Sequence, residues 1–108
     1  MNWEKLKKDY PKAWEELEEY HEYEYPEIDH PEIWGEHVDL TLSELRHLYD
    51  FFDSHHIIIE MWWSLPGFTP SIWDGPDIYH FRKFDSRPEA EVVAFEKCFA
   101  ILEEQLNK

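Results

Sequence analysis

The sequence contains one cysteine, Cys98, three glycines, and ten Lys and Arg residues against 25 Asp and Glu residues. A single cysteine cannot form an internal disulfide, which agrees with a reducing compartment. Isolated glycines exclude a glycine-rich phosphate-binding loop. No apolar run approaches the roughly 18 residues of a transmembrane helix, and no secretion signal is recognisable. We therefore expect a cytoplasmic protein without a membrane-spanning segment.

The shortage of positive charge is concentrated in one part of the chain. Residues 15–39 contain eleven acidic residues and neither Lys nor Arg, and the net charge of the whole chain is −15. A field of this sign repels nucleic acid and anionic membranes and attracts basic protein surfaces. The acidic segment is therefore either a solvated face that maintains solubility or a binding surface for a basic partner.

The composition is sufficient for one modest hydrophobic core. Of the 108 residues, 43% are hydrophobic and 18% are aromatic, which is typical of a folded domain and not of a disordered acidic tail. Apolar residues recur at spacings of three and four in three segments, which predicts amphipathic helices. The helices are predicted over residues 3–23, 42–53 and 87–106. Pro11 either begins a second helix in its first turn or kinks a continuous one, and the two later helices each begin with a capping box.

Between the second and third of these helices the apolar spacing changes to two, which predicts β-strands. Strands are expected over residues 56–64 and 78–84, with a weaker strand over residues 68–73 between them. Pro70 cannot donate to a sheet ladder, so the weaker strand is expected to be bulged or to lie at an edge. The sequence therefore predicts an α+β fold for a single domain, 1–108: N-terminal helices, then an antiparallel two- or three-stranded sheet packed by a C-terminal helix.

An acidic, proline-containing loop is predicted between the first two helical segments, at about residues 24–40. Pro26 and Pro31 restrict the residues before them to extended conformations, and a loop of this length in a compact domain is usually functional or disordered. Tyrosine and tryptophan residues are interspersed among its carboxylates. Such rings can stack on guanidinium groups while the carboxylates pair with them, so the loop is suited to an Arg-rich partner.

Further aromatic residues cluster in the predicted strands. Trp63 occupies a core-facing position in the alternation and is expected to be buried. Trp62 shares its face with Glu60 and Ser64, so it is either covered by a helix or exposed as part of the binding surface. The partner-binding residues predicted from these patterns are Glu22, Tyr23, Glu24, Tyr25, Glu27, Asp29, Glu32, Trp34, Glu36 and Trp62.

No arrangement typical of a catalytic or metal site is present in the sequence. The seven histidines are scattered, without the spacings that bring two ligands to one zinc ion. His30 and His37 in the predicted loop are the best candidates for weak metal binding, and the other histidines are expected at loop or surface positions. Cys98 falls on the apolar side of a helix, which favours a buried structural thiol over a nucleophile. We therefore predict no catalytic residue, metal ligand, cofactor or enzyme activity.

Three stretches of the chain, KLKKDYPKAWEEL, LRHLYDFFDSHHIIIEM and SRPEAEVVAFEKCFAILEEQL, carry a resemblance to other proteins. In these stretches the chain resembles short uncharacterised acidic proteins of phages and mobile elements of Bacteroidetes-type bacteria. The predicted loop at 24–40 does not match that pattern. The resemblance implies a setting, the cytoplasm of an infected or element-carrying bacterial host, and it implies no site residues. Acidic proteins of this setting are similar in kind to anti-CRISPR inhibitors.

Setting and charge together predict an acidic protein inhibitor that binds a basic nucleic-acid-binding surface of a host nuclease. Carboxylates spaced along a surface mimic phosphates, and interleaved rings can take the place of stacked bases. Two alternatives stay open. The protein is an immunity protein or antitoxin that neutralises a basic toxin, or it is a metal-binding regulator or small enzyme, which His30 and His37 would have to support. The expected partner is a basic host protein, and neither nucleic acid nor a membrane.

Overall fold

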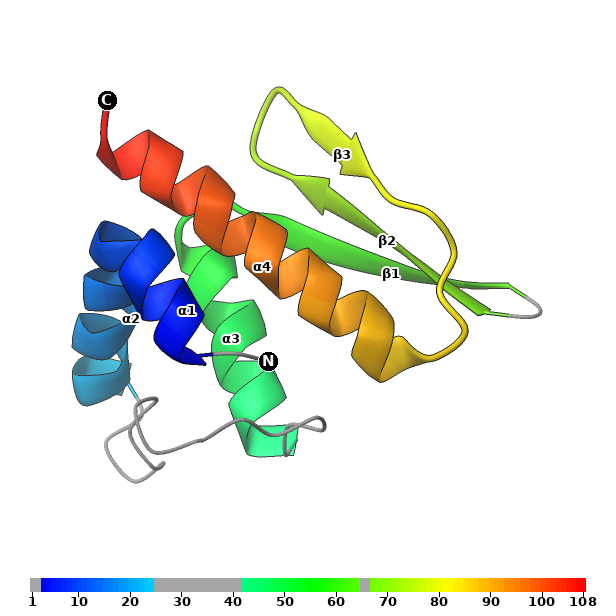
Figure 1. The fold of residues 1–108 in the computed structure, drawn as a ribbon, viewed down its shortest axis with the longest axis horizontal. Helices are drawn as coiled ribbons and strands as arrows, with labels where there is room; N and C mark the ends of the chain where they lie inside the picture. The colour runs from blue at the N-terminus through cyan, green and yellow to red at the C-terminus, as the bar shows by residue number, and fades with distance from the viewer. Residues whose placement is uncertain (1–2, 25–41, 65–66) are drawn as a thin grey trace.

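The computed structural model describes residues 3–24, 42–64 and 67–108. The elements are, in chain order, α1 (Trp3–Asp9), α2 (Pro11–Glu24), α3 (Leu42–Ser54), β1 (Ile58–Ser64), β2 (Gly67–Trp73), β3 (Ile78–His80) and α4 (Arg87–Leu106). In Figure 1, α4 lies across one face of the sheet, while α1, α2 and α3 gather at the end of the sheet where α3 leads into β1. This arrangement confirms the predicted α+β fold of N-terminal helices, an antiparallel sheet and a C-terminal helix packed on that sheet.

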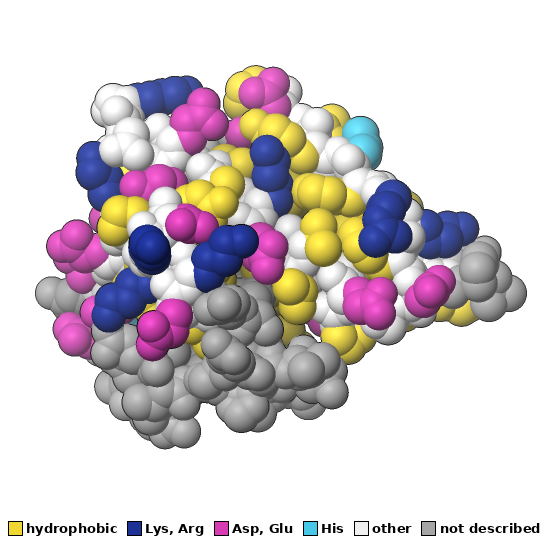
Figure 2. All heavy atoms as spheres, viewed as in Figure 1, with side chains coloured by type: hydrophobic (Ala, Val, Ile, Leu, Met, Phe, Trp, Pro, Cys, Tyr) yellow, Lys and Arg dark blue, Asp and Glu magenta, His cyan; other side chains and the backbone are white. Residues whose placement is uncertain are grey.

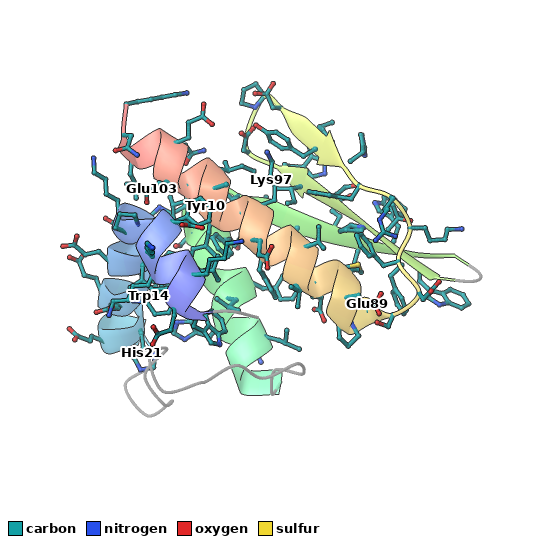
Figure 3. All side chains as sticks on the ribbon, in the orientation of Figure 1. Tyr10, Trp14, His21, Glu89, Lys97 and Glu103 are labelled. Carbon is teal, nitrogen blue, oxygen red and sulfur yellow. The ribbon has the colours of Figure 1, made fainter. Side chains whose placement is uncertain are left out.

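The chain breaks between α1 and α2 at Tyr10, and Pro11 is the first residue of α2. Proline suits this position because its missing N–H would have no partner in the first turn and its φ is already helical. The Ala13 N–H, another free donor of this turn, donates to the Glu103 Oε1 atom of α4 at 2.9 Å (Figure 3). α2 therefore starts as a new helix, the first of the two alternatives left open by the sequence, and a carboxylate 90 residues away in the chain caps it.

One hydrophobic core joins the helices to the sheet. Among the residues that the structure describes, the largest fully buried side chains are Phe51, Phe52, Phe95, Phe99, Leu17, Leu48, Ile57, Ile72, Leu102 and His47. Phe52 of α3 meets two rings of α4, with ring centroids 5.1 Å from Phe99 in an edge-on contact and 6.3 Å from the stacked Phe95. Contacts of this kind add to the burial of apolar area that stabilises the domain. Cys98 lies in the same core, and burial raises the pKa of its thiol, as expected of a structural cysteine.

α3 ends in a left-handed turn at His56, which has a φ of 61°. The His56 N–H donates to the Asp53 carbonyl at 2.9 Å, and the Ile57 N–H donates to the Phe52 carbonyl at 2.9 Å. These two bonds form a Schellman motif, in which the left-handed residue is usually glycine because a Cβ crowds the backbone there. His56 therefore forms the helix-to-strand corner at a conformational cost that glycine would not have.

Replacing His56 by Gly is expected to stabilise the protein by about 0.5–1 kcal/mol, since the left-handed conformation is unstrained for glycine. Chemical unfolding followed by circular dichroism measures the difference. His56→Ala is the matched control, because it removes the exposed imidazole but keeps the Cβ, and it should change the free energy of unfolding by less than about 0.5 kcal/mol. An equal gain from both variants would mean that the imidazole, and not the backbone, is the unfavourable group.

The sheet has the strand order β1-β2-β3, and both pairings are antiparallel. β2 is thus the central strand and its register with β1 is continuous, so the expectation that Pro70 places this strand at an edge or bulges it was wrong. The Pro70 carbonyl accepts from the Phe81 N–H at 3.3 Å. The Pro70 nitrogen lies on the same edge of β2 as this carbonyl, and it faces the chain beyond His80, where β3 has ended. The missing N–H therefore removes no bond from either regular ladder.

β3 is shorter than the predicted strand 78–84, because the chain leaves the sheet after His80 and returns to it at Phe84. There the Phe68 N–H donates to the Phe84 carbonyl at 2.8 Å and the Phe84 N–H donates to the Phe68 carbonyl at 2.7 Å. Gly67 precedes this bridge, and a Cβ at this position would overlap the Phe84 carbonyl oxygen. Glycine is therefore required where the returning chain crosses the start of β2.

Candidate functional site

The predicted partner-binding residues fall in three places. Glu22 is an exposed residue of α2, and Trp62 is 60% exposed on β1. Tyr23 and Glu24 belong to the last turn of α2. The remaining predicted residues, Tyr25, Glu27, Asp29, Glu32, Trp34 and Glu36, lie outside the described residues, as do residues 25–40 of the predicted loop. The described part of the acidic segment is therefore α2.

α2 has one buried side and one acidic side. Its buried residues are Ala13, Trp14, Leu17 and His21. Trp14 and His21 point from α2 toward the neighbouring helices in Figure 3. Glu15, Glu19 and Glu22 are exposed at positions i, i+4 and i+7 of the helix, a spacing that aligns them along one side. We call these three residues the acidic stripe. Figure 2 shows acidic side chains along the edge of the molecule where α2 lies, with basic side chains in front of them over α1.

Lys12 is exposed three residues before Glu15 on α2, so one positive charge lies at the start of the acidic stripe. Glu16 lies next to it, and its Oε2 atom is 3.8 Å from the Nε2 atom of His55 in the turn after α3. Burial lowers the pKa of His55 although Glu16 acts in the opposite direction, which limits the positive charge of this histidine at neutral pH. In the part of the chain that the structure describes, no Lys or Arg forms an ion pair with the acidic stripe. Its negative charge therefore remains available to a partner.

Two histidines lie on the buried side of the same helices, and the expectation of loop or surface positions was wrong for both. His21 of α2 and His47 of α3 are buried with their ring centroids 5.1 Å apart. Burial, and then the proximity of His21, lowers the pKa of His47 to about 4, while Asp50 acts in the opposite direction. The signal in the sequence was helical spacing, since His21 follows Leu17 on the apolar stripe. His47 is therefore neutral at physiological pH and belongs to the core.

Metal binding has no structural support within the described ranges. No group of three His, Cys, Asp or Glu side chains in residues 3–24, 42–64 and 67–108 is arranged to hold a metal ion. His30 and His37, the best candidates from the sequence, lie outside these ranges.

The face of the sheet turned away from α4 is a second candidate surface. The register places Ile58, Trp73 and Ile78 side by side across the three strands, and all three are exposed. Trp62 lies on the same face, four residues along β1 from Ile58, and is exposed rather than covered by a helix. This was one of the two alternatives for Trp62. Exposed apolar side chains that gather on one face of a sheet are a feature of binding surfaces.

A polar row lies between Trp62 and the apolar row. It consists of Glu60, Ser71 and His80, which are neighbours across the three strands. The Ser71 Oγ atom is 3.2 Å from the Nδ1 atom of His80, and Ser71 itself is buried among its neighbours. Glu60 is thus the one carboxylate in this row, and it is flanked along β1 by two exposed apolar side chains.

Trp63 is 65% exposed, so the expectation that it belongs to the core was wrong. Its side chain lies on the side of the sheet that α4 covers, opposite Phe68 of β2. In Figure 1, however, the ends of β1 and β2 extend beyond the first turn of α4. Alternation therefore gave the correct face, but no described helix reaches far enough to cover this residue.

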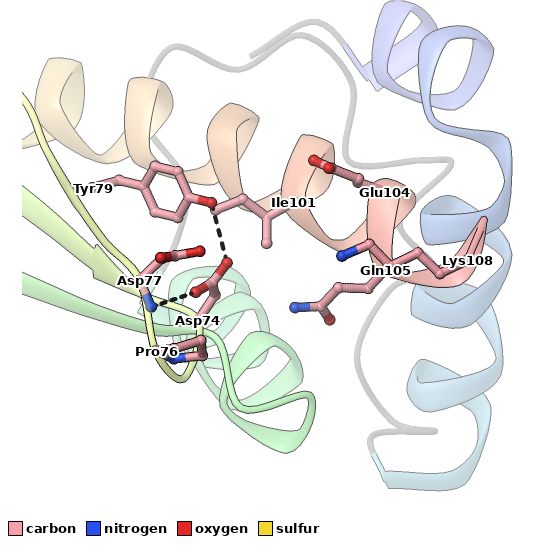
Figure 4. A pocket seen from close by; sticks show the side chains of 8 residues that line it. All are labelled: Asp74, Pro76, Asp77, Tyr79, Ile101, Glu104, Gln105 and Lys108. Atoms are coloured by element: carbon pink, nitrogen blue, oxygen red, sulfur yellow. Dashed lines mark hydrogen bonds between the residues drawn. The ribbon is translucent and has the colours of Figure 1, made fainter.

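A shallow pocket of about 180 Å³ lies where the turn between β2 and β3 meets the end of α4 (Figure 4). The residues that line it are Asp74, Pro76, Asp77, Tyr79, Ile101, Glu104, Gln105 and Lys108. The Asp77 N–H and the Tyr79 hydroxyl donate to the two carboxylate oxygens of Asp74, each at 3.2 Å. Asp74 therefore fixes the turn, and Lys97 packs over the Tyr79 ring at 4.8 Å. These contacts stabilise the turn that forms one side of the pocket.

The comparisons with known proteins add no family to these surfaces. None of the described helices combines the length and apolar character of a membrane span. Scans of this chain against protein-family models, curated proteins and solved structures found no match in any of the three. The functional argument therefore rests on the acidic stripe and on the outer face of the sheet.

Proposed function

We propose that this protein is an acidic inhibitor that binds a basic, nucleic-acid-binding surface of another protein, in the manner of phage anti-CRISPR inhibitors of host nucleases. The observation that supports the proposal is the acidic stripe on α2. Glu15, Glu19 and Glu22 are exposed in one row, and the whole chain has a net charge of −15. A nucleic-acid-binding groove is lined by Lys and Arg that attract the negative backbone of nucleic acid. The acidic stripe has charge of the same sign as that backbone, so the groove attracts it as well.

The anchoring of α2 makes the stripe a preorganised ligand. Trp14 and Leu17 bury the opposite side of the helix, and Glu103 of α4 caps its first turn. Because the helix is fixed before binding, the partner does not have to order it, which lowers the entropic cost of association. The basic groove of a nuclease could not hold this helix and nucleic acid at the same time. Inhibition is therefore competitive with nucleic acid, and the affinity should fall steeply as the salt concentration rises.

The triple reversal Glu15→Lys, Glu19→Lys and Glu22→Lys tests the proposal. We expect it to weaken inhibition at least about tenfold, since each reversal replaces an attraction by a repulsion at the interface. The fold should persist, because exposed substitutions away from caps and core usually change stability by about 0.5 kcal/mol or less. The measurement is nucleic-acid cleavage by purified guide-RNA nucleases, with the protein titrated at low and at high salt.

A second triple reversal, Asp77→Lys, Glu96→Lys and Glu104→Lys, is the matched control. These residues are exposed on α4 and on the turn between β2 and β3, and the change in net charge is the same. If both variants lose inhibition equally, total charge and not the stripe is responsible. Full inhibition by the α2 variant would contradict the proposal. Neutralisation of a basic toxin, with nuclease effectors unaffected, would favour an immunity protein or antitoxin instead.

A further inference from the structure

The backbone of β1 has one edge that no described strand pairs. β1 is the first strand in the order β1-β2-β3, and among the described strands it pairs with β2 alone. Phe68 and Pro70 of β2 direct their carbonyls away from β1, toward Phe84 and Phe81. Their partners across β1–β2 are Trp63 and Met61.

In an antiparallel pair, residues opposite each other both point inward or both point outward. The N–H and C=O groups of Trp63 and Met61 therefore point away from β2, and the same alternation applies to Ile59. β1 contains no Lys, Arg or Pro, and Glu60 is its one charged residue, so an incoming strand meets a single negative charge along this edge. The edge thus presents a row of alternate backbone donors and acceptors along its length.

The side chains beside this edge define what could pair with it. Glu60 lies on the outer face of β1 between Ile58 and Trp62, which are 46% and 60% exposed. A residue of an added strand that lies opposite Glu60 would have its side chain within reach of both the carboxylate and the Trp62 ring. Arg suits that position, since a guanidinium group can pair with the carboxylate and stack on the indole. Apolar residues suit the positions opposite Ile58 and Trp62.

We propose that the free edge of β1 binds an extended segment of a basic protein as a fourth strand, with an Arg side chain against Glu60 and Trp62. The inference rests on the proposed function in that the partner is basic, and it adds where a peptide of that partner docks. Backbone bonds supply affinity in such strand addition, and alternate side chains supply specificity. A second copy of this chain is disfavoured, because it would bring together two molecules with a net charge of −15 each and place no cation near Glu60.

The probe is a blocked peptide of about nine residues, a usual strand length, in which Arg and Val alternate. It is titrated into the full chain while tryptophan fluorescence and heat are recorded. Two control peptides are used: one has the same composition with its Arg residues clustered, and one has N-methyl groups on alternate residues, which prevent strand pairing. We expect the alternating peptide to bind at least about tenfold more tightly than either control, since only it can form the backbone bonds and the Arg contact together.

Substitutions in the chain locate the site. Glu60→Gln and Trp62→Ala are each expected to weaken binding of the alternating peptide about fivefold to tenfold. The α2 triple reversal should weaken binding of the alternating peptide and of the clustered control peptide by factors that differ less than twofold. Loss of inhibition in the α2 variant with peptide binding intact would support this inference separately from the proposed function. Loss of inhibition in the α2 variant, together with failure of the wild type to prefer the alternating peptide, would overturn the inference and leave the proposed function standing. Equal binding of all three peptides would overturn the inference, since charge alone would then explain it. So would a dimer in light scattering that Met61→Pro abolishes, because a second copy would then occupy the edge.

Discussion

Phe52→Ala is expected to lower the free energy of unfolding by about 3–5 kcal/mol, the usual range for removing a fully buried phenylalanine ring. Phe52 is 0% exposed and contacts both Phe95 and Phe99 of α4. Its loss would leave a cavity at the junction of α3 and α4, where neighbouring rings are too large to collapse fully into the space. Chemical unfolding followed by tryptophan fluorescence measures the change.

Trp63→Ala is the matched comparison, because it removes an even larger ring from a position that is mostly exposed. We expect this variant to change the free energy of unfolding by about 0.5 kcal/mol or less. A loss as large as that of Phe52→Ala would show that the end of the β1–β2 hairpin is packed and does not present its tryptophans to solvent. Retention of full stability by Phe52→Ala would contradict the assignment of the core.

Acidification is expected to destabilise the fold through His47 by up to about 3 kcal/mol. Burial lowers the pKa of this histidine from 6.5 to about 4, so the unfolded chain takes up a proton at a higher pH than the folded protein does. The contribution of neutral His47 is fully present above pH 6.5 and is lost as the pH falls toward about 4. In that window the slope approaches about 1.4 kcal/mol per pH unit.

The measurement compares urea unfolding of the wild type and of His47→Leu at several pH values between neutrality and the lower limit of this window. Protonation of the many carboxylates also changes stability in this range, by relieving the repulsion among them, but it does so in both proteins. The free energy of unfolding of the wild type minus that of His47→Leu therefore isolates the histidine. This difference should decrease as the pH falls, because only the wild type loses the contribution of neutral His47. His21 and Asp50 surround His47 and are unchanged in both proteins. Parallel curves would show that His47 titrates alike in the folded and unfolded chains.

Local patterns in the sequence were sufficient for the elements of this fold. Helical spacing and the position of Pro11 predicted either a break or a kink at this proline, and the structure has the break, which separates α1 from α2. The Ser86 half of the capping box predicted at the start of α4 is present, with the Glu89 N–H donating to the Ser86 Oγ atom at 3.4 Å. These features depend on a few consecutive residues, and so the sequence contains them directly.

The features that the sequence did not predict depend on how far elements extend in space. The exposure of Trp63 depends on where α4 ends relative to the hairpin. The central position of β2 depends on β3 ending at His80, before the place where the Pro70 N–H would have been needed. The His21–His47 contact depends on the packing of α2 against α3. None of these distances is encoded in the spacing of neighbouring residues.

The candidate site also has a part that the sequence predicted and a part that it did not. The acidic composition of α2 was evident from the sequence, and helical geometry then selects which carboxylates form a row. The free edge of β1 was not predicted, because strand order follows from the pairing of distant segments and not from alternation within one strand. Trp62 was selected for its position beside Glu60, and the register of the sheet adds the row of Ile58, Trp73 and Ile78 beyond them.

The cap that Glu103 forms on α2 bears on how the protein is made. The capped turn precedes its capping carboxylate by 90 residues, and a ribosome adds about 5–20 residues each second. The helix that presents the acidic stripe thus emerges several seconds before α4, on which it packs through Trp14 and Phe99 with ring centroids 6.4 Å apart. A helix of 14 residues is marginal on its own in water. The nascent chain therefore passes through an interval in which its acidic segment has been synthesised but is not yet a rigid ligand, and the stripe becomes fixed only once α4 has been synthesised.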